Sequence, residues 1–178
     1  MKVLDNILCE SEFKYLQEYF YKNLPWYYLD HVVNNGEHED LKCIQFTHTF
    51  FNSNDPYDLT ARSEHRAVIK PILLKLRPWL LLRAKANLRP ISSELIHSSF
   101  HTDLRDLKQL TAIYYLNTCD GYTLFNDGTK VTSVENRLLI FDGSKLHCGS
   151  STTDSKSRMV LNINYFPSTL PDGSKYVP

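Results

Sequence analysis

The sequence lacks the features that mark membrane-spanning, disulfide-stapled and nucleic-acid-binding chains. It has no run of about 18 apolar residues, so no segment is predicted to cross a membrane. Its 4 cysteines are scattered with no Cys-x-x-Cys pair, which disfavours a zinc ribbon or a disulfide scaffold and suits a reducing compartment. Lys plus Arg and Asp plus Glu both number 20, so no global basic field predicts a nucleic-acid partner. The N-terminus has no signal-peptide pattern, and we expect a cytoplasmic protein.

The composition is that of an ordinary globular protein, with 42% hydrophobic and 22% charged residues among 178. This length predicts a single domain over residues 1–178. Charge is uneven, because residues 62–89 contain one acid, Glu64, among many basic side chains. We expect this basic stretch to be mainly a solvated helix face, with Arg62, Arg66 and Lys70 one turn apart. A phosphate-binding surface is the less favoured alternative.

Hydrophobic periodicity predicts helices first and strands after. Apolar residues recur at helical spacing over 8–24 and again over 69–80, where Pro71 should kink or restart the helix. Residues 43–50 alternate as a strand does, and from Trp79 onward the period becomes two. The later predicted strands are roughly 92–101, 109–117, 122–126, 130–134, 136–141, 146–150 and 158–166. The pattern indicates an α+β, mainly β protein, a sandwich or barrel with the helices packed on one side.

A histidine and an aspartate two residues apart, His101 and Asp103, suggest a metal site. On a strand, alternate residues point to one face, so an imidazole and a carboxylate would converge. His147, near the start of a later predicted strand, is the candidate third ligand. Two histidines and one carboxylate on a β scaffold form the facial triad of non-haem Fe(II) oxygenases, which leaves coordination positions open.

Arg158, eleven residues after His147, opens the strand Arg-Met-Val-Leu-Asn-Ile-Asn-Tyr-Phe. A buried guanidinium near a metal suits a carboxylate, because its planar fork binds both oxygens. Asn162 and Asn164 share its face by alternation. Two amides are unusual in a core and natural in a polar pocket.

With these pieces in order, the chain resembles the 2-oxoglutarate- and Fe(II)-dependent oxygenases, in particular their prolyl-4-hydroxylase-like branch. The matching pieces, over about residues 80–166, are His101-Thr102-Asp103, the strand from Leu110 to Asn117, Gly121 to Phe125, Asn136 to Phe141, His147 and Arg158. The resemblance implies a distorted double-stranded β-helix, or jelly roll, with its core at about 80–166.

The resemblance also assigns roles to individual residues. It implies Fe(II) on His101, Asp103 and His147, and it pairs Arg158 and Tyr115 with the distal carboxylate of 2-oxoglutarate. Residues expected to line the cosubstrate pocket are Thr111, Ile113, Thr123, Asn162 and Asn164. The sequence shows no counterpart of the tyrosine that often precedes the His-x-Asp motif in this branch, so the partner of the metal-proximal carboxylate is open.

The implied reaction is oxidative decarboxylation of 2-oxoglutarate by O2 to succinate and CO2, coupled to hydroxylation of a substrate C–H bond, with ascorbate as a candidate reductant. A prolyl or protein residue is the favoured substrate. A free amino acid and a modified base remain open, the nucleic acid being less favoured because no second arginine follows Arg158. Two other functions stay open: a non-catalytic jelly-roll binding module, and a cupin-like metalloenzyme that does not use 2-oxoglutarate.

Three further residues could be read as functional or structural. His97 shares the predicted face of His101, but a structural histidine is favoured over a rival ligand. His48 lies on an apolar strand face, which favours a hydrogen-bonded core histidine. Cys148 follows His147 and more often packs than reacts, oxidation near iron being the functional alternative.

Overall fold

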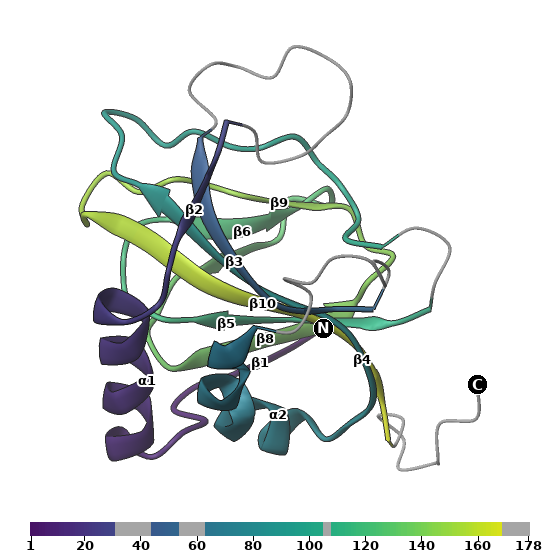
Figure 1. Cartoon of the computed structure of the whole chain (residues 1–178). Coiled ribbons are helices and arrows are strands. Elements are labelled where there is room, and N and C mark those ends of the chain that lie inside the picture. The colour runs from purple at the N-terminus through teal and green to yellow at the C-terminus, as the bar shows by residue number, and fades with distance from the viewer. Residues whose placement is uncertain (31–43, 54–62, 105–107, 169–178) are drawn as a thin grey trace.

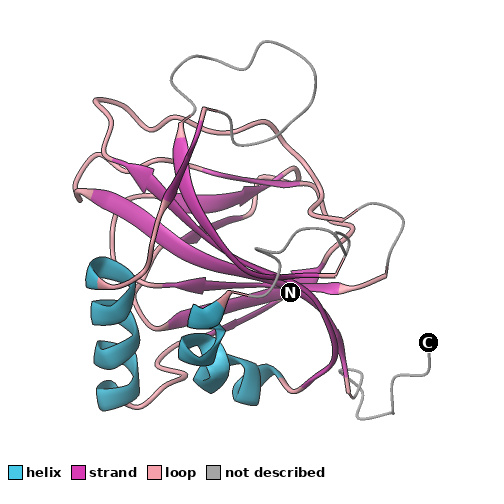
Figure 2. Ribbon diagram, viewed as in Figure 1, coloured by secondary structure: helices cyan, strands magenta, loops and turns pink. Residues whose placement is uncertain are grey.

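The computed structural model describes residues 1–30, 44–53, 63–104 and 108–168. Two antiparallel sheets form its framework (Figure 1, Figure 2). The larger sheet has seven strands in the order β1-β8-β5-β10-β4-β3-β2, and the smaller has three in the order β7-β6-β9. The bounds of the larger sheet's strands are β1 Lys2–Leu4, β2 Tyr27–Leu29, β3 Gln45–Asn52, β4 Pro78–Pro90, β5 Leu110–Tyr115, β8 Arg137–Asp142 and β10 Ser157–Pro167. Those of the smaller are β6 Tyr122–Phe125, β7 Lys130–Thr132 and β9 His147–Gly149.

Both α-helices lie on one side of the larger sheet, as predicted (Figure 1). Helix α1 spans Glu10–Lys22 and buries Phe13, Leu16 and Phe20. A 3-10 helix, η2, covers Glu64–Ile69, and α2, Lys70–Leu76, restarts the helix with a proline in its first turn, as Pro71 predicted. The predicted extension of this helix to residue 80 is wrong. Arg77 takes a left-handed conformation, φ 48°, and the chain leaves the helix as strand β4.

Alternation along the central strands creates two separate cores. Met159, Leu161 and Ile163 of β10 face the helices. Val160, on the opposite face, packs with side chains of the smaller sheet such as Phe125 in the space between the sheets. The space between the sheets therefore receives the odd-numbered residues of β4 and the even-numbered residues of β10. This arrangement confirms the predicted jelly roll with helices packed on one side.

The strand predicted over 92–101 is wrong. Among the described residues, the β-pairing of this segment is limited to isolated bridges at Ile91, His97 and His101. Hydroxyl side chains take the place of a strand ladder here, since Ser92 Oγ donates to the carbonyl of Glu94 at 2.7 Å and Ser151 Oγ accepts from Ile96 N at 2.9 Å. The other late strands form close to their predicted bounds, and no helix of the described residues is long and apolar enough to cross a membrane.

Candidate metal centre

His101 and His147 meet across an isolated antiparallel bridge. Each donates its backbone N–H to the other's carbonyl, with N–O distances of 3.0 Å. Each Nδ1 donates to a backbone carbonyl at 3.0 Å, that of Ser99 for His101 and that of Lys145 for His147. A carbonyl can only accept, so Nδ1 carries the proton and Nε2 of each neutral ring keeps a free lone pair.

Asp103 completes the group. The ligand atoms of His101, Asp103 and His147 lie within 4.8 Å of one another, and Asp103 Oδ2 is 3.7 Å from His147 Nε2. His101 and Asp103 converge, but the prediction that they do so as alternate residues of one strand is wrong, because Asp103 lies beyond the bridge at His101 and in no strand. Other side chains aim its carboxylate.

Four side chains donate hydrogen bonds to the Asp103 carboxylate, whose side chain is only 2% exposed. Oδ1 accepts from Arg83 Nη2 at 2.8 Å and from Asn162 Nδ2 at 2.9 Å. Oδ2 accepts from Thr111 Oγ1 and from Asn164 Nδ2, both at 3.1 Å. Arg83 and Asn162 also line the cavity, whereas Thr111 and Asn164 contact Asp103 without lining it.

Electrostatics favours an ionised Asp103 and a neutral His147. Burial raises the pKa of Asp103, but the charge of Arg83, the two histidines in their protonated form and the Asn164 hydrogen bond outweigh it, and the pKa lies below its ordinary value. The pKa of His147 is also lowered, chiefly by burial, although Asp103 opposes this. A carboxylate beside neutral imidazoles is the donor set that a divalent metal requires.

Arg158 lies buried at another part of the same cavity, only 4% exposed. Its Nε donates to Ser133 Oγ at 2.9 Å and its Nη2 to Thr123 Oγ1 at 3.2 Å. Thr123 in turn accepts from Tyr115, whose ring lies 5.6 Å from the guanidinium carbon. No carboxylate of the described residues pairs with Arg158, so a buried positive charge stands without a counter-ion beside the cavity.

Gly121 makes room for this arginine. A Cβ at Gly121 would lie 2.5 Å from the carbonyl oxygen of Ser151 and 2.6 Å from Cδ of Arg158. Any larger residue would therefore displace the backbone of Ser151, the arginine or both.

The cavity between the sheets has a volume of about 270 Å³. The metal-ligand candidates, Arg158, Thr123, Ile113 and Asn162 all line it. Tyr115 stands behind this wall, where its hydroxyl donates to Thr123 at 2.8 Å. The triad and the buried arginine thus lie at one cavity, as the sequence predicted. Some of the other predicted pocket residues lie behind the lining instead.

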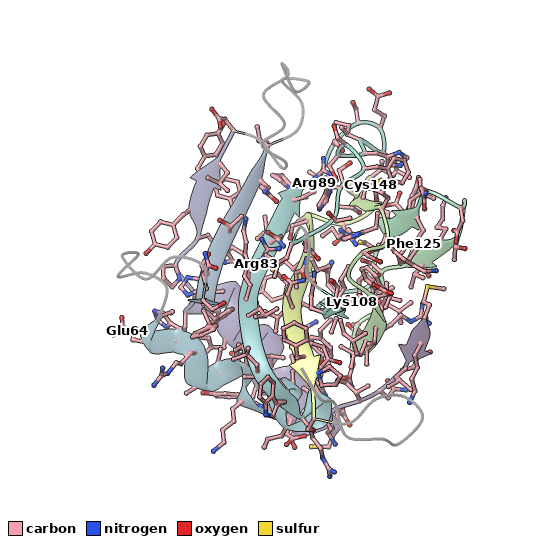
Figure 3. All side chains as sticks on the ribbon, turned by 90° about the vertical axis from the view of Figure 1, so that its right-hand side faces the viewer. Glu64, Arg83, Arg89, Lys108, Phe125 and Cys148 are labelled. Carbon is pink, nitrogen blue, oxygen red and sulfur yellow. The ribbon has the colours of Figure 1, made fainter. Side chains whose placement is uncertain are left out.

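Sequence reasoning missed the positive wall that β4 contributes. Arg83, Lys85, Asn87 and Arg89 all line the cavity, and Figure 3 shows Arg83 and Arg89 along this one strand. The solvated-face interpretation of the basic stretch is wrong for these residues, although it holds for Arg66 and Lys70, which are exposed. Arg62 lies outside the described residues. The alternation with Leu82, Ala84, Ala86 and Leu88 was the available signal, because it places the basic residues together on one face.

The other ambiguous residues have structural surroundings. His48 hydrogen-bonds the carbonyl of Pro25 and Ser63 Oγ, both at 2.8 Å, which confirms a hydrogen-bonded core histidine. His97 is not a cavity residue and contacts the Tyr122 hydroxyl. Cys148 is buried and lines the cavity.

Solved structures match this chain, whereas curated sequences do not. No family model matches the sequence, and no curated protein sequence matches it. A prolyl hydroxylase from Trichoplax adhaerens, solved with a peptide of the hypoxia inducible factor oxygen degradation domain, superposes with a TM-score of 0.58 and 15% identity. That match covers 94% of this chain and 83% of the hydroxylase.

Two further solved structures agree. HygX from Streptomyces hygroscopicus, solved with nickel and 2-oxoglutarate, has a TM-score of 0.56 and 15% identity, covering 98% of this chain and 90% of HygX. A prolyl-4-hydroxylase from Pseudomonas putida has a TM-score of 0.54 and 13% identity, covering 93% and 91%. The chain therefore has the fold of the 2-oxoglutarate-dependent oxygenases. Within that class, its fold is shared with prolyl hydroxylases.

Proposed function

We propose that the protein is a 2-oxoglutarate- and Fe(II)-dependent dioxygenase that hydroxylates a C–H bond of its substrate. The observation that carries this proposal is the joint presence, in one cavity, of the His101, Asp103 and His147 group and the buried Arg158 without a carboxylate partner. Similar solved structures with 2-oxoglutarate bound support the assignment of cosubstrate.

The residues fit a divalent metal. Both histidines present a free Nε2 because Nδ1 of each is bound to a carbonyl, and Asp103 supplies a buried carboxylate oriented by its own hydrogen bonds. Three ligands leave positions open for a bidentate 2-oxo acid and O2. When bound, Fe(II) would supply the activation of O2 that oxidative decarboxylation of 2-oxoglutarate requires.

The protein's own part is binding, orientation and exclusion of water. Arg158 would hold the distal carboxylate of 2-oxoglutarate through its guanidinium, with Thr123 as a polar neighbour. Ile113 and Val160 give the cavity an apolar wall between these two ends. Such a wall keeps the carbon chain of the cosubstrate dry and strengthens the electrostatic contacts at each end.

Arg158 also separates this function from the alternatives. A cupin-like metalloenzyme without 2-oxoglutarate has no use for a buried guanidinium in the metal cavity, and a non-catalytic module has no use for a hydrogen-bonded metal-ligand set. The primary substrate is a separate question. A prolyl or protein residue remains the prediction of the resemblance, and the Trichoplax enzyme's peptide is consistent with it.

The decisive experiment is anaerobic visible spectroscopy of purified protein with Fe(II), then 2-oxoglutarate. A weak charge-transfer band should appear only after both additions. The band should vanish in His147→Ala, and in Arg158→Ala it should need far more 2-oxoglutarate. Folded wild-type protein that gives no band would overturn the proposal. Retention of the band at unchanged 2-oxoglutarate affinity in Arg158→Ala would remove Arg158 from the cosubstrate site.

A further inference from the structure

The cavity carries more positive charge than the cosubstrate can neutralise. Its charged lining consists of Arg83, Lys85, Arg89 and Arg158 against one carboxylate, Asp103. A doubly charged metal and a doubly negative 2-oxoglutarate would cancel, so the loaded cavity would keep a formal surplus of about three positive charges. A neutral prolyl side chain would leave that surplus in place, whereas an anionic substrate would reduce it.

Three of the four cations already have a role. Arg83 is bound to Asp103, Arg89 Nη1 donates to the carbonyl of Gly149 at 2.8 Å, and Arg158 stands ready for the distal carboxylate. Lys85 is different. It lines the cavity with no hydrogen bond or ion pair to any of the residues that the structure describes.

Asn162 stands directly across from Lys85, because the two residues are partners in the β4–β10 register. Its Nδ2 donates to Asp103 at 2.9 Å, which fixes the amide orientation, since a carboxylate only accepts. Its Oδ1 is consequently turned away from Asp103. This oxygen is buried and has no hydrogen-bond partner within the described part of the chain, and Asn162 as a whole is only 8% exposed.

A half-buried ammonium group without a partner among the described residues and a buried, unsatisfied amide oxygen therefore belong to paired residues, next to the metal-ligand candidates. Leaving the buried Asn162 oxygen unpaired costs free energy, and a ligand with a donor for this oxygen and an anionic group for Lys85 would complement both groups. Burial lowers the pKa of Lys85 to about 8, with Arg83 adding repulsion and Asp103 opposing. A bound anion would stabilise the charged form and raise the pKa of Lys85 again.

We propose that Lys85 and Asn162 form the recognition site for the primary substrate, which carries a carboxylate for Lys85 and a hydrogen-bond donor for Asn162 Oδ1. This inference rests on the proposed function and gives its substrate class as a small amino or hydroxy acid. The cavity supports a small molecule, because its volume of about 270 Å³ must also hold 2-oxoglutarate.

The test compares acids with their own amides. Protein loaded with Ni(II) and 2-oxoglutarate is titrated calorimetrically with amino and hydroxy acids, L-proline included, and with the primary amide of each. At least one acid should bind about tenfold or more tightly than its amide. Lys85→Met should abolish that preference, and Lys75→Met, which removes an exposed lysine of α2, should keep it.

A parallel arm measures 2-oxoglutarate itself in the same variants. Lys85→Met should change its affinity by less than about threefold. A large loss there, with the acid preference retained, would assign Lys85 to the cosubstrate and overturn the inference. Equal binding of acid and amide across the panel, absence of binding by both included, would also overturn it. If the proposed function itself is wrong, the result is different, because wild-type protein would then not bind 2-oxoglutarate with metal at all.

Discussion

His101 and His147 face each other as a hydrogen-bonded pair, with both backbone N–O distances at 3.0 Å and ring centroids 4.9 Å apart. The bridge joins a segment without regular structure to the first residue of β9. The bridge therefore fixes the two backbones relative to each other, and the carbonyls of Ser99 and Lys145 orient the two rings.

Removing either histidine should destroy metal binding without unfolding the protein. We expect His147→Ala to weaken Ni(II) affinity by more than the roughly 10–100-fold that loss of an outer partner costs, because a direct ligand is lost. Titration calorimetry measures this, with His97→Ala as the matched control, since His97 is outside the cavity. Equal losses in the two variants would contradict the assigned ligand set.

Loss of a side chain that donates a hydrogen bond to the Asp103 carboxylate should weaken metal binding. Asn164→Ala and Thr111→Val each remove one bond to Oδ2, and each should weaken metal binding by about 10–100-fold. The reason is that the carboxylate loses its fixed orientation. Asn126→Ala, on an exposed turn, should leave the affinity unchanged. Unaltered affinity in both Asp103-contacting variants would show that orientation is set elsewhere.

Gly121→Ala should distort the surroundings of Arg158. The added methyl group would approach the Ser151 carbonyl at 2.5 Å and Arg158 Cδ at 2.6 Å. Overpacking of this kind costs about 1–3 kcal/mol of unfolding free energy. We expect a weaker 2-oxoglutarate complex as well, measured by the anaerobic band, while Ni(II) affinity changes little. A variant with normal stability and normal 2-oxoglutarate affinity would mean that the chain relaxes easily here.

Lys85 should make stability depend on alkaline pH. Its pKa is lowered from 10.5 to about 8 in the folded protein. Below pH 8 the lysine is charged in the folded and in the unfolded protein, and the folded protein bears the full free-energy cost of burying that charge. As the pH rises from 8 toward 10.5, the lysine loses its proton in the folded protein first, and this cost disappears. The stability advantage of Lys85→Met should therefore shrink by roughly 3 kcal/mol over that interval. Urea unfolding at neutral pH and at about pH 10 measures it, and an advantage independent of pH would contradict the burial of a charged lysine.

Asn136 should contribute to stability rather than to catalysis. Its Oδ1 accepts from Leu8 N at 3.1 Å and from the Tyr114 hydroxyl at 2.9 Å, and its Nδ2 donates to the carbonyl of Leu8 at 2.9 Å. Its φ of 59° lies in the left-handed region that asparagine tolerates. Asn136→Ala should cost several kcal/mol because buried partners lose their bonds. Tyr114→Phe, which removes one bond, should cost less, and the reverse order in thermal unfolding would refute this account.

The sequence by itself determined the elements that depend on local pattern. Alternation located β4 and β10, helical spacing located α1, and Pro71 marked the restart of α2. The order of His101, Asp103, His147 and Arg158 pointed to the metal and cosubstrate chemistry, because residue type and chain order are carried in the sequence itself.

Tertiary structure decided what depends on partners distant in the chain. Nothing local shows that Arg83 binds Asp103, that serine hydroxyls replace a strand ladder over 92–101, or that Lys85 faces Asn162. The basic run looked like a solvated face because charge normally seeks water. It became a cavity wall because the even-numbered residues of β4 pack against the helices, which leaves the alternate, charged residues pointing into the space between the sheets.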